Sequence, residues 1–412
     1  MIASVPIPGS LPHTKAASPD EIETRPEFDE RLALGRLAGA IVQGVRLDVN
    51  PPDLRGIDLR DTLFVGCRFP DAETAADVVR RGGSVVPIFE ETPYPSSPSK
   101  LYTPTDLAAG FADTDGFDAM FDTIVYQHFL SRGGVLPDVR EALAQRIHDA
   151  GIDDALMDTL RKWVDRHGET TVVGVMGGHA EPRGSHTYRL AASLGVELAR
   201  AGRLLVTGGG PGVMEAANLG AFMSGRSAAE LDAAIDVLAT APDFRDHGPY
   251  TATALRVRAL YPASVDGRSA SSRSGESSGG DGMEWLAAGG LSVPTWLYGH
   301  EPANLFAGGI AKYFSNAIRE DTLLRLARGG VVFAPGWAGT VQEVFQAATK
   351  AFYFADGASG PLIFLGRSFW TDVVPVRSLL APLLAASPHG DQSSLIRLTD
   401  DVSEAVAALT GG

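Results

Sequence analysis

A glycine-rich turn followed by a hydroxyl and a carboxylate stands out at residues 335–343, PGWAGTVQE. A short apolar run precedes this turn and a helical pattern follows it, so the turn is predicted to open a helix. The free N–H groups of a helix start favour an anion such as a phosphate; Gly336 and Gly339 allow close approach, and Thr340 adds a hydroxyl. Glu343 lies about one helical turn further on, where it is expected to face the bound group. The same residues are also typical of an ordinary strand–helix corner with a capping threonine.

Two more glycine turns follow predicted strands. The apolar run 171–176 ends at Gly177-Gly178, and the run 204–207 ends at residues 208–212, GGGPG. Strands that alternate with helices predict an α/β fold, a Rossmann-like doubly wound parallel sheet. Ligands of such sheets bind at the carboxyl ends of the strands, where all of these glycine turns are expected to lie.

Three further side chains near predicted strand ends are candidates for the same site: His179, His300 and Glu301. An isolated histidine is also typical of a simple hydrogen-bonding role in a loop. No HExxH pattern or carboxylate cluster indicates a metal site, so no cofactor is expected, with Mg²⁺ accompanying a phosphate left open. No lysine stands in a Schiff-base context, which argues against a pyridoxal-phosphate enzyme.

The composition narrows the class of partner. A net charge of −15 and a pI near 5.0 argue against nucleic acid or an anionic membrane as a partner. Cys67 is the single cysteine, which leaves no disulfide framework within one chain. No signal peptide or membrane-spanning apolar stretch is evident, so a cytoplasmic protein is expected.

The chain is predicted to contain two domains. Residues 1–25 are rich in proline and serine and are predicted to be a flexible arm. Residues 26–165 are predicted to form an α/β accessory domain without a chemical motif, which caps the main domain or forms an oligomer contact. Residues 166–412 are predicted to form the Rossmann-like domain. It contains a Ser/Gly-rich insertion near 265–282 that is predicted to be disordered.

Apolar spacing predicts further elements within these domains. A helix is expected over residues 28–45 and a long helical region over residues 304–326. Residues 291–298 are expected to resume the sheet.

Two blocks of the chain resemble a known family. Residues 208–217, GGGPGVMEAA, match a GGGxGxM block, and residues 335–343 resemble a PGGxGTxxE block. These blocks, in this order, resemble the LOG ("lonely guy", lysine-decarboxylase-like) family over about residues 170–412. Residues 294–301 and 315–321 look like its longer bacterial subgroup, the nucleotide 5′-monophosphate nucleosidases.

The resemblance implies a Rossmann-like fold, a homodimer or higher homo-oligomer, and phosphoribohydrolase activity. That reaction cleaves the N-glycosidic bond of a nucleoside 5′-monophosphate into free base and ribose 5-phosphate. The family's catalytic glutamate and arginine fall on Glu343 and Arg319. For this reaction Gly336, Gly339 and Thr340 are expected to hold the 5′-phosphate. Gly209, Gly210 and Gly212 are expected to line the facing wall, with Met214 and Glu215 behind them, and Glu215 is a possible ribose contact.

This sequence departs from the family pattern at two positions of the second block. Trp337 replaces a glycine and Gln342 replaces a glutamate. The Trp337 ring is a candidate for stacking on a base or for simple loop packing. A non-catalytic binder of a nucleotide or of molybdenum cofactor is therefore the alternative function. The presence of Glu343 and Arg319 favours the enzyme, and Trp337 favours the binder.

Overall fold

The computed structural model describes residues 20–111, 116–262 and 288–411. The insertion predicted near 265–282 and most of the predicted arm, 1–25, lie outside these residues. The described chain forms two compact units. The smaller unit holds residues 20–101 and 127–159, and the larger holds residues 102–126 and 160–411 apart from the gaps. Residues 102–126 therefore group with the larger unit, whereas the sequence pattern placed them in the N-terminal domain.

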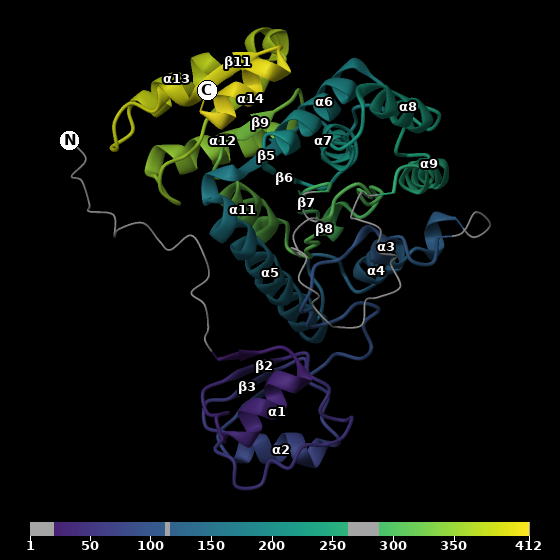
Figure 1. The fold of residues 1–412 in the computed structure, drawn as a ribbon, viewed down its shortest axis with the longest axis vertical. Coiled ribbons are helices and arrows are strands. Elements are labelled where there is room, and N and C mark those ends of the chain that lie inside the picture. The colour runs from purple at the N-terminus through teal and green to yellow at the C-terminus, as the bar shows by residue number, and fades with distance from the viewer. Residues whose placement is uncertain (1–19, 112–115, 263–287, 412) are drawn as a thin grey trace. The chain divides into compact units, whose positions relative to one another are not determined.

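The larger unit is built on a seven-stranded parallel sheet with the strand order β11-β10-β9-β5-β6-β7-β8 (Figure 1). Every pairing in it is parallel. The strands are β5 (Val172–Met176), β6 (Leu204–Thr207), β7 (Leu291–Ser292), β8 (Gly309–Ile310), β9 (Val331–Phe333), β10 (Leu362–Leu365) and β11 (Ile396–Thr399). The predicted α/β class and doubly wound parallel sheet are confirmed.

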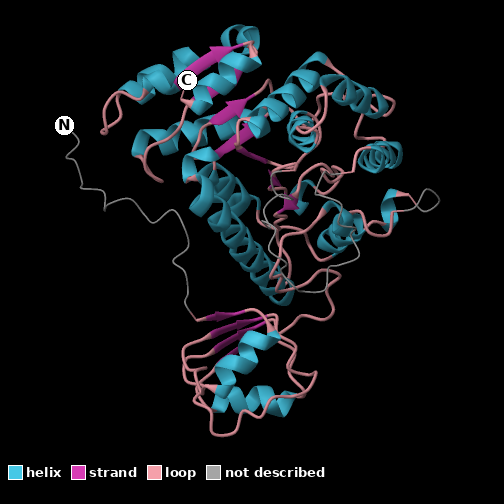
Figure 2. Ribbon diagram, in the orientation of Figure 1, coloured by secondary structure: helices cyan, strands magenta, loops and turns pink. Residues whose placement is uncertain are grey.

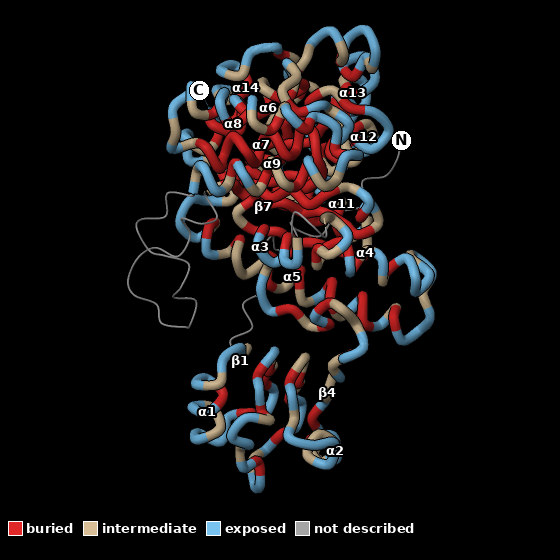
Figure 3. Tube along the Cα trace, turned by 90° about the vertical axis from the view of Figure 1, so that its right-hand side faces the viewer, coloured by how far each residue is buried: buried red, intermediate tan, exposed pale blue. Residues whose placement is uncertain are grey.

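Helices cover this sheet in two packed groups (Figure 1). One group is α6 (His186–Arg200), α7 (Val213–Phe222) and α14 (Val402–Thr410), and the other is α11 (Asn316–Leu326), α12 (Ala338–Tyr353) and α13 (Val376–Ala385). The unit also contains α3 (Pro104–Leu107), α8 (Ala228–Leu238) and α9 (His247–Leu260). Because helices lie on both faces, the central strands β5, β6, β9 and β10 are buried along their whole length. Figure 3 shows the buried positions concentrated in this part of the chain.

The strand order reverses beside β5. The chain crosses from β5 to β6 on one side, and β9 pairs with β5 on the other side. The backbone N–H of Gly178, just after β5, donates to the carbonyl of Pro335, just after β9, at 2.9 Å. A switch point of this kind leaves a crevice at the carboxyl edge of the sheet, which is the usual ligand position in such folds.

The smaller unit has its own parallel sheet, with the order β1-β2-β3-β4 (Figure 2). Its elements are β1 (Glu21–Ile22), α1 (Arg25–Ala33), β2 (Ile41–Gln43), β3 (Leu63–Val65), α2 (Ala72–Arg80) and β4 (Ser84–Val86). Phe28, Val42, Phe64 and Val78 belong to its hydrophobic core. Two longer helices, α4 (Phe121–Ser131) and α5 (Val139–His167), each contain one boundary between the two units, and a third boundary lies between Leu101 and Tyr102.

Three predicted elements are wrong in extent. The helix predicted over residues 28–45 ends at Ala33, because Gly35 and Gly39 adopt positive φ angles of 64° and 76°, and strand β2 follows. The helix predicted over residues 304–326 begins only at Asn316, because Gly309–Ile310 pairs with β7. The strand predicted over residues 291–298 stops at Ser292 and gives way to a 3₁₀ turn, Trp296–Tyr298. Long-range strand pairing sets the bounds of the last two elements, and the local periodicity of apolar residues does not reveal that pairing.

None of the helices within the described residues combines the length and the apolar character that a membrane span requires.

Candidate functional site

A cavity of about 460 Å³ lies at the carboxyl ends of β5, β6, β7 and β9. This volume is within the roughly 300–1,000 Å³ that is usual for small-molecule sites. The turns after β5, β6 and β9 all contribute to its wall. Of the predicted site residues, those that line it are His179, Gly209, Gly210, Met214, His300, Glu301, Arg319, Trp337, Gly339, Thr340 and Glu343. Gly212, Glu215 and Gly336 are not among its lining residues.

Arg319, on α11, has a guanidinium group that connects two strand ends. Its Nε donates to the carbonyl of Val293 at 2.8 Å, and its Nη2 donates to the carbonyl of Gly208 at 3.0 Å. A Cβ at Gly208 would lie 2.6 Å from Nη2, so a glycine is needed there for this contact. The third nitrogen, Nη1, is 3.7 Å from Oε1 of Glu343 and 4.0 Å from Oε1 of Glu320. The arginine is therefore held in place by the backbone, with one nitrogen left to face carboxylates.

Glu343, in the second turn of α12, is almost completely enclosed. Its side chain is 12% exposed, and that of Arg319 is 8% exposed. Burial raises the pKa of Glu343 to about 7, against the lowering effect of Arg319 and with a smaller raising effect from Glu320. A carboxyl group with this pKa exchanges its proton near neutral pH, which suits an acid–base role.

The start of α12 forms one wall of the cavity. Trp337 precedes the helix, and its side chain makes no capping hydrogen bond to the first-turn N–H groups. Gly339 and Thr340 line the cavity beside these groups. Gly336 has a packing role: a Cβ there would lie 2.2 Å from the Thr340 hydroxyl and 2.9 Å from the Gly178 nitrogen. Because the Trp337 side chain does not cap the helix, the first-turn N–H groups are offered to an anion, as is common at helix N-termini.

The turn after β6 forms the facing wall. Gly209 has a φ of 78°, and a Cβ there would lie 2.4 Å from the Ser292 hydroxyl. Gly212 has a φ of 70° and lies against the carbonyls of Gly178 and His179, so it joins two glycine turns instead of lining the cavity. Met214, on α7, is buried and lines the wall behind them.

Glu301 and His179 occupy another side of the cavity. Oε1 of Glu301 is 3.8 Å from Nδ1 of His179, and the Glu301 side chain is 13% exposed. Burial raises the pKa of the Glu301 carboxyl, and His300, Arg319 and Lys312 reduce this effect. Burial also lowers the pKa of His179, as does the nearby Arg245, so the neutral imidazole is favoured.

Trp337 is the most exposed aromatic side chain of the cavity wall. Its side chain is 72% exposed, and its ring lies edge-on to Phe369 with a centroid distance of 5.8 Å. An exposed ring beside a cavity offers a face to a flat ligand.

Glu215 lies in a buried polar network and not in the cavity. Its carboxylate accepts from Arg183 Nε at 2.8 Å, Tyr188 Oη at 3.0 Å and Tyr250 Oη at 2.7 Å, and also from Arg183 Nη2. The residue is 1% exposed. The first turn of α7 therefore directs Glu215 towards α6 and α9, where it joins helices. Its predicted contact with ribose has no support in this geometry.

Lys312 is a lining residue that the sequence patterns did not select. Its Nζ donates to both carboxylate oxygens of Asp122, at 2.6 and 2.8 Å, and Trp296 Nε1 donates to the same carboxylate at 2.8 Å. Asp122 lies 190 positions earlier in the chain, so no local pattern relates it to Lys312. The ion pair holds the lysine ammonium on Asp122, while Arg319 faces the carboxylates of Glu343 and Glu320.

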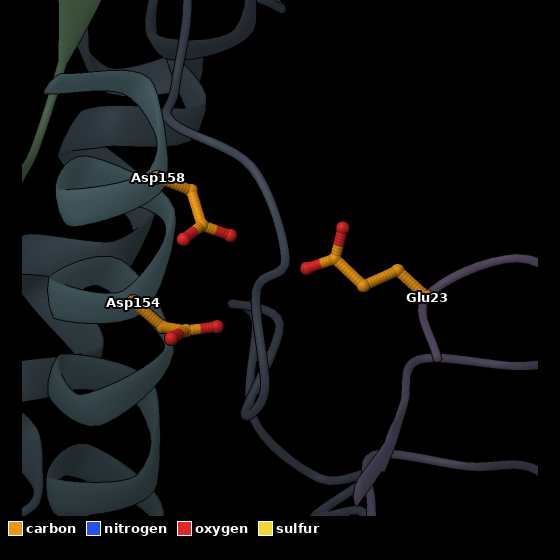
Figure 4. A group of neighbouring side chains, drawn as sticks. All are labelled: Glu23, Asp154 and Asp158. Atoms are coloured by element: carbon orange, nitrogen blue, oxygen red, sulfur yellow. The ribbon is translucent and has the colours of Figure 1, made fainter. Parts of the chain in front are cut away.

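Three carboxylates also lie together in the smaller unit, as Figure 4 shows for Glu23, Asp154 and Asp158. Their oxygens lie within 4.8 Å of one another. Burial, followed by repulsion from Asp158 and Asp154, raises the pKa of Glu23. Exposed acidic groups of this kind are common without an ion, so the geometry alone assigns no metal.

The comparisons with known proteins bear on part of the larger unit. Residues 170–228 match a model of the SLOG cluster4 family, which belongs to the SLOG superfamily. This segment runs from β5 through the glycine turn 208–212 to the start of α8. A search of curated proteins gave no significant match. Since the SLOG superfamily includes nucleotide-modifying enzymes, the match supports a nucleotide-related function in a broad sense.

Proposed function

We propose that this protein hydrolyses the N-glycosidic bond of nucleoside 5′-monophosphates to free base and ribose 5-phosphate. The observation that carries the proposal is the pairing of Arg319 with Glu343 inside a cavity enclosed by glycine turns. The pair combines a carboxyl group that titrates near neutral pH with a guanidinium group anchored on two carbonyls. The resemblance of the glycine blocks to phosphoribohydrolases supports the same reaction.

The chemistry follows from the transition state of the reaction. Breaking the bond between C1′ and the base leaves an oxocarbenium-like sugar, which an ionised carboxylate stabilises by its charge. Glu343 in its ionised form supplies that charge and takes a proton from the attacking water. Arg319 favours the ionised form of Glu343 and orients its carboxylate.

The 5′-phosphate is proposed to lie at the start of α12. Free N–H groups of the first helical turn, together with the Thr340 hydroxyl, would donate hydrogen bonds to its oxygens. Both cationic side chains of the wall have other partners: Lys312 pairs with Asp122, and Arg319 donates to carbonyls and faces Glu343. The backbone is therefore assigned the main part of phosphate recognition. The base would then be free to reach the exposed Trp337 ring.

A direct assay tests the proposal. The protein is incubated with AMP, GMP, IMP, CMP and UMP, and free base and ribose 5-phosphate are measured beside the Glu343→Gln variant. Base release by the wild type that the variant loses supports the hydrolase. Tight binding of one nucleotide without any release would contradict it.

The non-catalytic binder remains the second candidate because of one observation. Trp337 replaces a glycine of the resembling block, and its exposed ring lines the cavity beside the helix start. A binder of a nucleotide or of molybdenum cofactor would bind its ligand with the same affinity when Glu343 is replaced by glutamine. A hydrolase would also retain binding in this variant but would lose the turnover that its wild type shows, so turnover separates the two functions.

A further inference from the structure

The enclosed carboxyl of Glu301 has no role in the mechanism above, although it lines the same cavity as Glu343. The two groups come from different parts of the chain. Glu343 is on α12, and Glu301 follows the 3₁₀ turn after β7. The backbone N–H of Glu301 donates to the carbonyl of Tyr298 at 2.9 Å, which fixes the residue at the end of that turn.

The Glu301 carboxyl lies directly against the glycine turn after β6. A Cβ at Gly210 would lie 3.0 Å from its Oε2. Gly210 therefore leaves the space into which the carboxyl extends. The same turn is proposed to form one wall of the nucleotide site, so a bound nucleotide would lie within reach of the carboxyl.

The hydrogen bonding of Glu301 differs from that of the other enclosed carboxylates. Glu215 receives several donors, and Glu343 faces Arg319. Among the described residues the Glu301 carboxyl accepts no hydrogen bond, and His179 Nδ1, at 3.8 Å from Oε1, is farther away than a hydrogen bond allows. An enclosed carboxyl without donors is stabilised in its neutral form, because burial penalises the charge. Its O–H proton is then available to a ligand in the cavity.

We infer that Glu301 is the general acid that protonates the departing base. The inference rests on the proposed function. As the bond between C1′ and the base nitrogen breaks, the bonding electron pair goes to the base, and the base takes the proton of Glu301. Water adds to C1′, and its proton goes to Glu343. The products are neutral base and ribose 5-phosphate, and the proton on Glu343 returns through solvent to Glu301.

Several cationic groups act on Glu301 and partly offset the effect of its burial. His179 and His300 lie nearest in the cavity wall, while Arg319 from α11 and Lys312 after β8 act on it electrostatically. Arg319 lies close to Glu343, and Lys312 is paired with Asp122. The two carboxyl groups therefore have different surroundings, and Glu343 is the one beside a cation. Burial raises the pKa of both groups, and the form with Glu343 ionised and Glu301 protonated is one of the two singly protonated forms of the pair.

The test compares two kinds of leaving group. A purine of AMP, GMP or IMP needs a proton to leave, whereas the base of 7-methylguanosine 5′-monophosphate already carries a positive charge. Loss of a general acid commonly costs about 10²–10⁴-fold in rate. We expect Glu301→Gln to lower kcat on AMP, GMP and IMP by about 10²-fold or more, and on the 7-methylguanosine nucleotide by less than about 10-fold. Glu343→Gln is expected to lower kcat on both kinds of substrate.

Two controls accompany this comparison. Glu197→Gln, at an exposed position on α6, is the matched variant and should not change either rate. The second readout is the pH profile of the wild type, which should have a falling limb on its high-pH side as Glu301 loses its proton. That limb should be absent from Glu301→Gln. Glu301→Asp keeps the carboxyl group, so its pH profile should keep the falling limb. It replaces Glu301→Gln if the glutamine variant does not fold.

The outcomes separate the inference from the function on which it rests. If the wild type releases no base from any nucleotide, the proposed hydrolase itself fails. If the wild type is active and Glu301→Gln loses activity equally on both kinds of substrate, or on neither, Glu301 is not the general acid. The proposed hydrolase function would still stand. A falling high-pH limb that persists in the pH profile of Glu301→Gln would also overturn the assignment.

Discussion

Nη1 of Arg319 lies 3.7 Å from Oε1 of Glu343, and both side chains are enclosed between α11 and α12. The guanidinium group cannot easily move away, because its other nitrogens donate to the carbonyls of Val293 and Gly208. Burial nevertheless outweighs the attraction of the arginine and keeps the pKa of Glu343 at about 7. The pair is therefore arranged to change its protonation near neutral pH, and this arrangement has consequences that can be measured.

The first prediction concerns the activity profile of the pair. If the ionised Glu343 is the working form, kcat/KM should rise with pH through about 7. Arg319→Met removes the charge that favours the ionised form of Glu343. The rising limb of the pH profile should therefore move to higher pH, and the rate should fall by about 10²-fold or more. Arg319→Lys keeps the charge without the fork of donors, so its limb should move less. A limb that stays in place in Arg319→Met would show that another group titrates.

A second prediction follows from the same pKa but concerns stability. The pKa of Glu343 is raised from 4.5 to about 7 in the folded protein, so between these values the folded state binds more protons than the unfolded state. Stability therefore falls as pH rises through this window, by at most roughly 3 kcal/mol. Glu343→Gln removes this loss. We expect the variant to match the wild type in thermal stability near pH 4 and to exceed it above pH 7.

Thermal unfolding curves from pH 4 to pH 8 measure this difference. Glu197→Gln, which alters an exposed glutamate, is the control and should show no pH-dependent gain. A Glu343→Gln variant that is less stable than the wild type at pH 8 would show that contacts of the carboxylate outweigh the cost of its burial.

The third prediction concerns Glu215. Replacing it by glutamine leaves the buried guanidinium of Arg183 without its counter-charge. Breaking one partner of a buried pair commonly costs about 3–5 kcal/mol, so urea unfolding of Glu215→Gln should show a loss of this order. Asp236→Asn removes a partner of Arg189 at an exposed position and should cost less than about 1 kcal/mol. Equal effects of the two substitutions would contradict the structural role of the network.

The fourth prediction concerns the exposed ring of Trp337. Stacking of a base on an aromatic side chain is worth about 1–3 kcal/mol, so Trp337→Ala should weaken nucleotide binding by about 5- to 150-fold. Trp337→Phe should lose less, because an aromatic face remains. Neither variant should change the melting temperature by much, since the side chain is 72% exposed. Calorimetric titration with a nucleotide monophosphate gives the affinities, and unchanged binding by Trp337→Ala would remove the stacking role.

The last prediction concerns metal removal. The proposed mechanism uses carboxyl groups, backbone N–H groups and one arginine, and no step requires a metal. Treatment with EDTA followed by dialysis should leave kcat unchanged. Loss of activity that Mg²⁺ restores would instead indicate a metal that accompanies the phosphate.

The alternating part of the fold was determined by local sequence. The runs at β5, β6, β9 and β10 are apolar along their whole length, which is what a strand covered on both faces requires. Ser185, a residue type that commonly caps helices, accepts from the Tyr188 N–H and begins α6. Strands that alternate with helices then leave few topologies other than a parallel sheet with its glycine turns at one edge.

The tertiary structure decided what each candidate side chain contacts. Glu215 and Glu301 were both possible site residues, and neither local pattern separates them. Glu215 meets Arg183, Tyr188 and Tyr250, which come from three other places in the chain, whereas Glu301 faces the cavity. The same holds for Lys312, which Asp122 neutralises from 190 positions away. Sequence periodicity reports which face of an element is buried, but the partner on that face comes from strand order and helix packing.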